Sequence, residues 1–225
     1  MRIALGIEYD GGAFNGFQYQ SHAPSVQGAL QDALSQVAAA PVKLTAAGRT
    51  DSGVHATYQV VAFDAPVDRP LDAWIRGTNA LTPDSVAVLW AVEVPLEFHP
   101  RFQATARRDL YLCYDLEEVS PLLAGRVTFS RQLRDEKMHR AARCLLGEQD
   151  FSAFRAAGCQ SKTPMRAVQQ VSVSRAGGFV LIDITANAFL LHMVRNIAGS
   201  LWEIGLARRE PDWIQELLSG RDRSK

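Results

Sequence analysis

The chain has 225 residues with 24 basic and 24 acidic side chains, so its formal net charge is zero. Hydrophobic residues make up 47% of the sequence and charged residues 21%, a balance that excludes an intrinsically disordered chain. The length predicts one large domain or two small ones, and either can bury a hydrophobic core. No stretch reaches the roughly 18 uncharged apolar residues of a membrane span.

In chain order, the first hundred residues alternate strands and helices. Residues 2–9 alternate apolar and small or polar side chains, which predicts a strand. Ser25 is placed to cap a helix that runs to Ala39 with one apolar face. The other elements expected here are an extended segment at 43–46, strands at 54–63 and 85–94, and a helix at 71–80.

The remaining residues mix the same two kinds of element. Gly177-Gly178 between two apolar runs predicts a hairpin, so at least part of the sheet is antiparallel and the fold class is α+β. A change in charge balance near 101–107 predicts two α/β halves, residues 1–104 and 105–225. The expected elements are strands at 105–115, 168–174 and 179–185, and helices at 135–146 (closed by Gly147), 150–157, 188–204 and after Pro211.

The neutral total hides an uneven distribution of charge. Residues 1–100 contain five basic and ten acidic side chains, whereas residues 101–225 contain 19 and 14. Arginine outnumbers lysine by 20 to 4, and the planar guanidinium suits phosphate and base stacking. This pattern indicates either an anionic partner or a set of solvated surface charges, and the counts alone favour neither.

The cysteines and histidines indicate in which compartment the protein resides and whether it binds a metal. Cys113, Cys144 and Cys159 are widely spaced and form no C-x-x-C pair, which is typical of a reduced cytosolic protein. Glu8 interrupts the first apolar run too early for a signal peptide. The five histidines lack metal-ligand spacing, and the glycines at 11–16 lack the Lys-Ser/Thr of a P-loop. We expect a cytoplasmic protein with no metal and no nucleotide cofactor.

One segment, Ala46-Ala-Gly-Arg-Thr-Asp-Ser-Gly-Val-His-Ala56, carries a catalytic pattern. Arg49 and Asp51 lie between Gly48 and Gly53, and such glycines permit a tight backbone and the close approach of a ligand. A nearby guanidinium keeps a carboxylate ionised, as a nucleophile requires. The alternative is an ordinary Asp-Ser-Gly turn with a surface ion pair.

The run G-R-T-D-S-G-V-H-A resembles the catalytic loop of the tRNA pseudouridine synthase A family. The similarity extends through nearly the whole chain, because other segments match in the same order. These segments are Tyr9-Asp-Gly, Phe14-Asn-Gly-Phe-Gln18, Arg76-Gly-Thr-Asn-Ala80, Phe98-His99, Arg101-Phe102, Ala104-Thr-Ala-Arg-Arg108, Asp150-Phe151, Ala186-Asn-Ala-Phe-Leu190 and His192-Met-Val-Arg-Asn-Ile197.

The resemblance implies a fold and an activity. The implied pseudouridine synthase fold has two α/β halves that share a mixed, mainly antiparallel central sheet with flanking helices. Enzymes of this family isomerise uridine to pseudouridine at nucleotides 38, 39 and 40 of the tRNA anticodon stem-loop, without cofactor or metal. They act as homodimers, with one tRNA spanning both subunits.

The resemblance also assigns roles to residues. Asp51 is the expected nucleophile, although attack at C1′, attack at C6 and abstraction of a sugar proton all stay open. Tyr111 corresponds to a pocket tyrosine that stacks on the flipped uracil and acts in proton transfer; a core strand tyrosine is the alternative. Arg195 is expected to be a partly buried cation paired with Asp51, and Arg49 to assist base flipping or hold the backbone. The expected tRNA backbone contacts are Arg107, Arg108, Arg126, Arg131, Arg155, Lys162 and Arg166.

Two features depart from the family pattern. Asp109-Leu110 stands before Tyr111, where the family has aromatic and basic residues, and the added acid is expected to weaken local phosphate contact. The family also continues through another helix and a terminal G-L-x-L strand beyond the point where this sequence stops, at Lys225. We expect a continuation of the chain in preference to an incomplete pocket floor.

Two other classes of function remain as alternatives. The first is a non-catalytic RNA-binding or RNA-chaperone module on the same fold. The second is an enzyme for an anionic small molecule, which predicts neither tRNA affinity nor salt-dependent binding.

Overall fold

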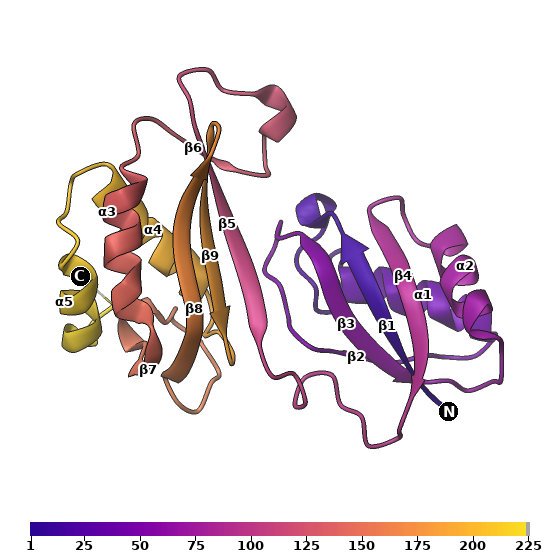
Figure 1. Cartoon of the computed structure of the whole chain (residues 1–225). Coiled ribbons are helices and arrows are strands. Elements are labelled where there is room, and N and C mark those ends of the chain that lie inside the picture. The colour runs from indigo at the N-terminus through magenta and orange to yellow at the C-terminus, as the bar shows by residue number, and fades with distance from the viewer. Residues whose placement is uncertain (224–225) are drawn as a thin grey trace. The chain divides into compact units, whose positions relative to one another are not determined.

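The computed structural model describes residues 1–223, and the chain splits into two compact units, Met1–Ala104 (unit 1) and Thr105–Lys225 (unit 2) (Figure 1). Each unit combines a sheet with helices, so the α+β class is confirmed. We expected one central sheet shared by both halves. The hydrogen-bonded ladders of the described residues instead form two sheets, one of four strands and one of five. Each sheet packs on its own hydrophobic cluster.

Unit 1 has a four-stranded antiparallel sheet in the order β2-β3-β1-β4. All its expected strands and helices are confirmed to within about two residues at each end. They are β1 (Arg2–Tyr9), α1 (Val26–Ala38), β2 (Leu44–Ala46), β3 (Ala56–Asp64), α2 (Leu71–Leu81) and β4 (Val86–Val94), with a 3-10 turn at Gly11–Ala13.

The core of unit 1 follows from strand alternation and helix periodicity. Ile3, Leu5 and Ile7 of β1 are fully buried and belong to the same cluster as Leu30 and Leu34 of α1. The two helices lie on one side of the sheet (Figure 1). The hydroxyl of Ser25 accepts the backbone N–H of Gly28 at 3.2 Å, which confirms the expected N-cap.

Unit 2 has a five-stranded sheet in the order β6-β5-β9-β8-β7, in which the β5–β6 pair is parallel and the other pairs are antiparallel. The β8–β9 hairpin turns at Gly177, which has φ 57°, so the predicted hairpin is confirmed. The elements are β5 (Arg107–Asp115), β6 (Thr128–Ser130), α3 (Asp135–Ala142), β7 (Gly147–Asp150), β8 (Met165–Ala176), β9 (Phe179–Ala186), α4 (Met193–Gly205) and α5 (Trp213–Gly220), with 3-10 turns at Pro121–Leu123, Arg143–Leu145 and Ser152–Phe154.

Two helix predictions in this unit were wrong in extent or kind. The α-helix expected over 135–146 ends at Ala142, where the chain continues as the 3-10 turn Arg143–Leu145, and Gly147–Asp150 then pairs with β8 as an unexpected strand. That pairing also removes the start of the helix expected over 150–157, where a 3-10 turn forms at Ser152–Phe154.

Helix α4 begins later than expected, at Met193 in place of Ala188. His192 has a left-handed backbone with φ 58°, which a continuous helix does not allow. The Asn187 side chain accepts the backbone N–H groups of Ala167 and Ala188, so the preceding segment is tied to β8. Within residues 1–223, no helix has the length and apolar character needed to cross a bilayer.

Candidate functional site

The loop between β2 and β3 carries Arg49 and Asp51 in unit 1. Gln59 of β3 fixes its beginning, because its amide donates to the Gly48 carbonyl at 3.1 Å and accepts the Gly48 N–H at 3.3 Å. Gln59 is buried, so these hydrogen bonds are shielded from competing water. The start of the loop is therefore held through both backbone polar groups of Gly48.

The middle of the loop rests on the segment 9–17, which the sequence showed only as a separate glycine-rich stretch. The Phe17 N–H donates to the Thr50 carbonyl at 3.0 Å, and the Gly53 N–H donates to the Phe14 carbonyl at 3.3 Å. The hydroxyls of Tyr9 and Thr50 are 2.9 Å apart. These bonds fix the backbone immediately before and after Asp51.

Two glycines allow this close contact. Gly16 has φ 101°, and a Cβ built there would lie 2.9 Å from the Thr50 carbonyl oxygen. A Cβ on Gly11 would overlap the Val54 carbonyl oxygen. A larger residue at either position would push the two segments apart, so the glycines are required by the packing of the loop.

His55 fixes the end of the loop. Its Nδ1 lies 2.9 Å from an Asp10 carboxylate oxygen and 3.2 Å from the Gly11 nitrogen, so it either donates to the carboxylate or accepts the Gly11 N–H. With both ends and the middle held, Asp51 stands half-buried and Arg49 exposed on a fixed backbone. This arrangement meets the requirement that a reacting carboxylate be positioned before substrate arrives.

In unit 2, Tyr111 lies on β5 opposite Ile182 of β9. Its ring packs against the hydrophobic cluster of the unit, as the core-tyrosine alternative anticipates. Its hydroxyl is 2.7 Å from the hydroxyl of Thr128 on β6. The sequence did not indicate Thr128, because β6 is a three-residue strand whose partner only the fold reveals.

Arg195 lies in the first turn of α4 and is exposed, so its expected partial burial was wrong. It is two residues away from both Met193 and Ile197, which places it on the opposite side of α4 from these buried residues. The buried stripe is Met193, Ile197, Ala198, Leu201 and Ile204. Arg195 and Asp51 lie in different units, and their pairing stays a prediction.

Arg107 and Arg108 begin β5, and each contacts a neighbouring group. The Arg107 guanidinium donates to the Asn187 carbonyl at 2.8 Å. Arg108 pairs with Asp183 of β9 at 2.6 Å, and this hydrogen-bonded carboxylate raises the pKa of Arg108. The charge of Arg108 is thus largely offset within the sheet, which the sequence could not show because the pairing depends on strand register.

The other expected tRNA contacts differ in how far they are buried and in what they bond to. Arg166 is buried at 8% exposure and donates to the carbonyls of Thr163 and Met165, and burial lowers its pKa. It ties the start of β8 to the loop before it, and its contact with the tRNA backbone stays a prediction. Arg155 likewise donates to carbonyls of the loop, whereas Lys162 is exposed.

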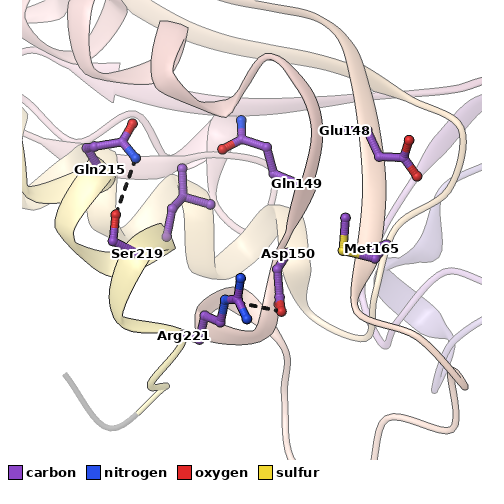
Figure 2. A pocket seen from close by; sticks show the side chains of 8 residues that line it. Glu148, Gln149, Asp150, Met165, Gln215, Ser219 and Arg221 are labelled. Atoms are coloured by element: carbon purple, nitrogen blue, oxygen red, sulfur yellow. Dashed lines mark hydrogen bonds and ion pairs between the residues drawn. The ribbon is translucent and has the colours of Figure 1, made fainter.

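A cavity of about 520 Å³ opens between β7 and α5 (Figure 2). Arg221 reaches Asp150 across it, with Nε 3.5 Å from the carboxylate oxygen. None of the predicted site residues lines it. Among residues 1–223, no three His, Cys, Asp or Glu side chains are grouped to hold a metal ion. The lining residues are Glu148, Gln149, Asp150, Met165, Gln215, Leu218, Ser219 and Arg221.

Comparison with known proteins identifies the family. The family model described as tRNA pseudouridine synthase matches residues 6–103 and 141–225. Arg49, Asp51 and Arg195 fall inside these ranges. Strand β5, with Tyr111, falls between them.

Curated relatives match the whole chain. The tRNA pseudouridine synthase A of Actinobacillus pleuropneumoniae serotype 7 (strain AP76) is 54% identical over 225 residues, covering 100% of this chain and 86% of that protein. The proteins of the same name from Shewanella frigidimarina (strain NCIMB 400) and Photorhabdus laumondii subsp. laumondii are 52% and 51% identical, with 99% and 100% of this chain and 86% of each relative covered. The chain therefore belongs to the tRNA pseudouridine synthase family.

Proposed function

We propose that this chain isomerises uridine to pseudouridine at nucleotides 38, 39 and 40 of the tRNA anticodon stem-loop, with Asp51 as the nucleophile. Family membership supports the coarser part of this statement, an isomerase that makes pseudouridine in tRNA. The observation that carries the assignment of Asp51 is the loop of residues 47–55, held at its start, middle and end by Gln59 and the segment 9–17.

The reaction explains why a fixed carboxylate is useful. The N1–C1′ glycosidic bond breaks, the uracil turns, and a C5–C1′ bond forms, so C5 loses a proton and N1 gains one. The base has to stay trapped throughout, which a positioned group in a water-excluding site can achieve. A carboxylate can attack C1′ or C6, or abstract a sugar proton, and all three routes remain compatible with the loop.

The other residues receive roles by the same resemblance. We propose that Tyr111 stacks on the flipped uracil and that its hydroxyl takes part in proton transfer. Arg195 is proposed to pair with Asp51, Arg49 to assist base flipping, and Arg107 to contact the tRNA backbone. Arg108 is a weaker backbone contact than its charge suggests, since Asp183 already pairs with it.

Binding is proposed to depend on the shape of the stem-loop and its phosphates more than on its sequence. We further propose that the enzyme acts as a homodimer in the cytoplasm, with one tRNA spanning both subunits. No metal or cofactor is part of the proposal.

The direct experiment is to incubate the purified chain with an unmodified tRNA transcript that carries uridine at 38, 39 and 40, and then to map pseudouridine by chemical modification and primer extension. We expect pseudouridine at these nucleotides and at no uridine outside the anticodon arm. A transcript that is bound but returned unmodified would favour the alternative, a non-catalytic RNA-binding module.

A further inference from the structure

The sheet of unit 1 has an outer face that lies away from α1 and α2 (Figure 1). Ile3, Leu5 and Ile7 of β1 are buried in the core, so the alternation of the strand places the residues between them on the outer face. The strand register assigns the partners of those residues to the same face. The outer face includes Gly6 and Glu8 of β1, Tyr58 and Val60 of β3, and Trp90 and Val92 of β4.

Two aromatic rings meet on this face above β1, the strand that separates β3 from β4. The half-buried indole of Trp90 rests against the backbone of β1, because a Cβ built on Gly6 would overlap it. A side chain at position 6 would displace the indole, so the glycine provides its seat. Tyr58 is 63% exposed, and its ring centroid lies 6.1 Å from that of Trp90. The pair therefore presents aromatic surface from a fixed position.

The pair lies near the end of the sheet that carries the loop of residues 47–55. Strand β3 begins at Ala56, directly after the loop, and Tyr58 is its third residue. Gly6 lies three residues before Tyr9, or about 10 Å along β1. The Tyr9 hydroxyl in turn lies 2.9 Å from the hydroxyl of Thr50 in the loop. A few nucleotides of RNA span the distance between the loop and the aromatic pair.

The charge of the outer face favours the bases of an RNA over its phosphates. Glu8 is exposed on the strand beside Tyr58, and its carboxylate repels a phosphate group. Val60 and Val92 add apolar surface and no charge. Exposed aromatic rings stack on unpaired bases with little regard to sequence, and the loop of a stem-loop offers such bases. The occupant that fits this face is therefore a nucleobase.

We propose that Tyr58 and Trp90 form a stacking platform for one unpaired base of the tRNA anticodon loop. The inference rests on the proposed function, because it takes the tRNA substrate from it. The platform binds and orients the RNA beside the loop that carries Asp51, and it takes no part in the chemical step.

The contact is tested with an anticodon stem-loop RNA that carries the fluorescent base 2-aminopurine at one loop position at a time. We expect binding to the wild type to quench the fluorescence at one of these positions, because a stacked 2-aminopurine emits weakly. Tyr58→Val, which keeps a residue suited to a strand but removes the ring, should lose this quenching. Tyr58→Phe, which keeps the ring, should retain it.

Affinity and turnover are measured on the same variants. Tyr58→Val should raise the dissociation constant and KM about tenfold, as loss of one stacked base predicts. It should leave kcat within about twofold, because the stacking is the same in the ground state and the transition state. Trp90→Leu should raise the dissociation constant by a similar factor. Val92→Ala is the matched control, since Val92 is 44% exposed on the same face and has no ring, and it should bind as the wild type does.

Several outcomes would overturn the inference. Wild-type quenching and affinity in Tyr58→Val would do so, as would an equal loss of affinity in Val92→Ala. Sedimentation of Tyr58→Val as a monomer beside a dimeric wild type would assign the face to a second copy of the chain instead. If Tyr58→Val does not fold, Tyr58→Thr makes the same comparison. A wild-type chain that forms no pseudouridine refutes the proposed function itself, whereas an active wild type with an unaffected Tyr58→Val refutes this inference alone.

Discussion

The groups that hold the backbone around Asp51 come from the segment 9–17 and from Gln59. Each such hydrogen bond contributes on the order of 1 kcal/mol net, so several together make movement of the loop costly. Asp51 itself is half-buried. At the scale of single residues, one set of groups therefore holds the loop, and the proposed nucleophile Asp51 lies between the positions that they hold.

The cysteines differ in the pKa of their thiols because their surroundings differ. The Cys159 sulfur accepts the Leu191 N–H at 3.4 Å. Burial opposes its ionisation, but N–H groups of Leu191 and Ser161 and the Arg155 guanidinium outweigh it, so the pKa of Cys159 is lowered. Burial and the nearby Asp115 raise the pKa of Cys113 to about 11.

We therefore predict that iodoacetamide near pH 7.5 alkylates Cys159 well before Cys113, because the thiolate is the reacting form. The rate at Cys159 should rise with pH and level off below the ordinary thiol range of about 8.5. Peptide mass spectrometry over time measures the three cysteines in one sample. Faster labelling of Cys113 in the folded protein would contradict the prediction.

At the scale of elements, the sequence predicted a helix or hairpin correctly where its pattern was contained in one continuous segment. Gly177-Gly178 predicted the hairpin, and Ser25 with its apolar periodicity predicted α1. Strands β6 and β7 were missed because their three and four residues carry no clear alternation, and pairing with longer neighbours decides their structure. Tertiary contacts overrode local preference there.

The same difference applies to the residues around the candidate site. The loop that carries Asp51 and Arg49 could be located because its motif is continuous in sequence, and the roles of the two residues stay predictions. Thr128 and Asp183 could not, since each meets its partner across a strand pair whose register only the fold fixes. Arg195 was expected to be partly buried, but it lies on the face of α4 opposite the buried residues Met193 and Ile197.

The contact between the loop of residues 47–55 and the segment 9–17 can be tested with Gly16→Ala. The substitution forces a Cβ toward the Thr50 carbonyl and places alanine at φ 101°, so we predict a loss of about 1–3 kcal/mol of stability and a fall in kcat of at least tenfold per folded molecule. Circular dichroism and pseudouridine formation measure the two effects.

Gly177→Ala is the matched control for Gly16→Ala. It also has a positive φ, 57°, but a Cβ there meets nothing within 4 Å. It should lose some stability and keep its turnover. Equal losses of turnover in the two variants would indicate that the effect of Gly16→Ala comes from general destabilisation.

At the scale of the whole molecule, the zero net charge is a cancellation between two unlike parts. The first 100 residues carry twice as many acids as bases, and the rest carries 19 bases against 14 acids. Ion pairs such as Arg108–Asp183 and Arg175–Asp115 reduce the number of cations left for a partner. The excess of charge that remains in unit 2 is still positive.

This charge predicts salt-dependent binding of tRNA. The logarithm of the association constant should fall linearly with the logarithm of salt concentration, with a slope of about −0.7 to −0.9 for each phosphate neutralised. Exchanging the exposed Lys162 for Gln should reduce the slope by about one such unit, whereas exchange of the buried Arg166 should act mainly on stability. Filter binding between 50 and 200 mM salt measures both. A slope near zero would favour the small-molecule alternative.

The central claim, that the carboxylate of Asp51 is the reacting group, is tested most directly by Asp51→Asn, which keeps the shape of the side chain and removes the charge. Single-turnover conversion of an unmodified tRNA transcript is measured beside the dissociation constant for the same transcript. We predict no detectable pseudouridine, together with a dissociation constant within a few fold of the wild type. Pseudouridine formation at the wild-type rate in Asp51→Asn would contradict the account.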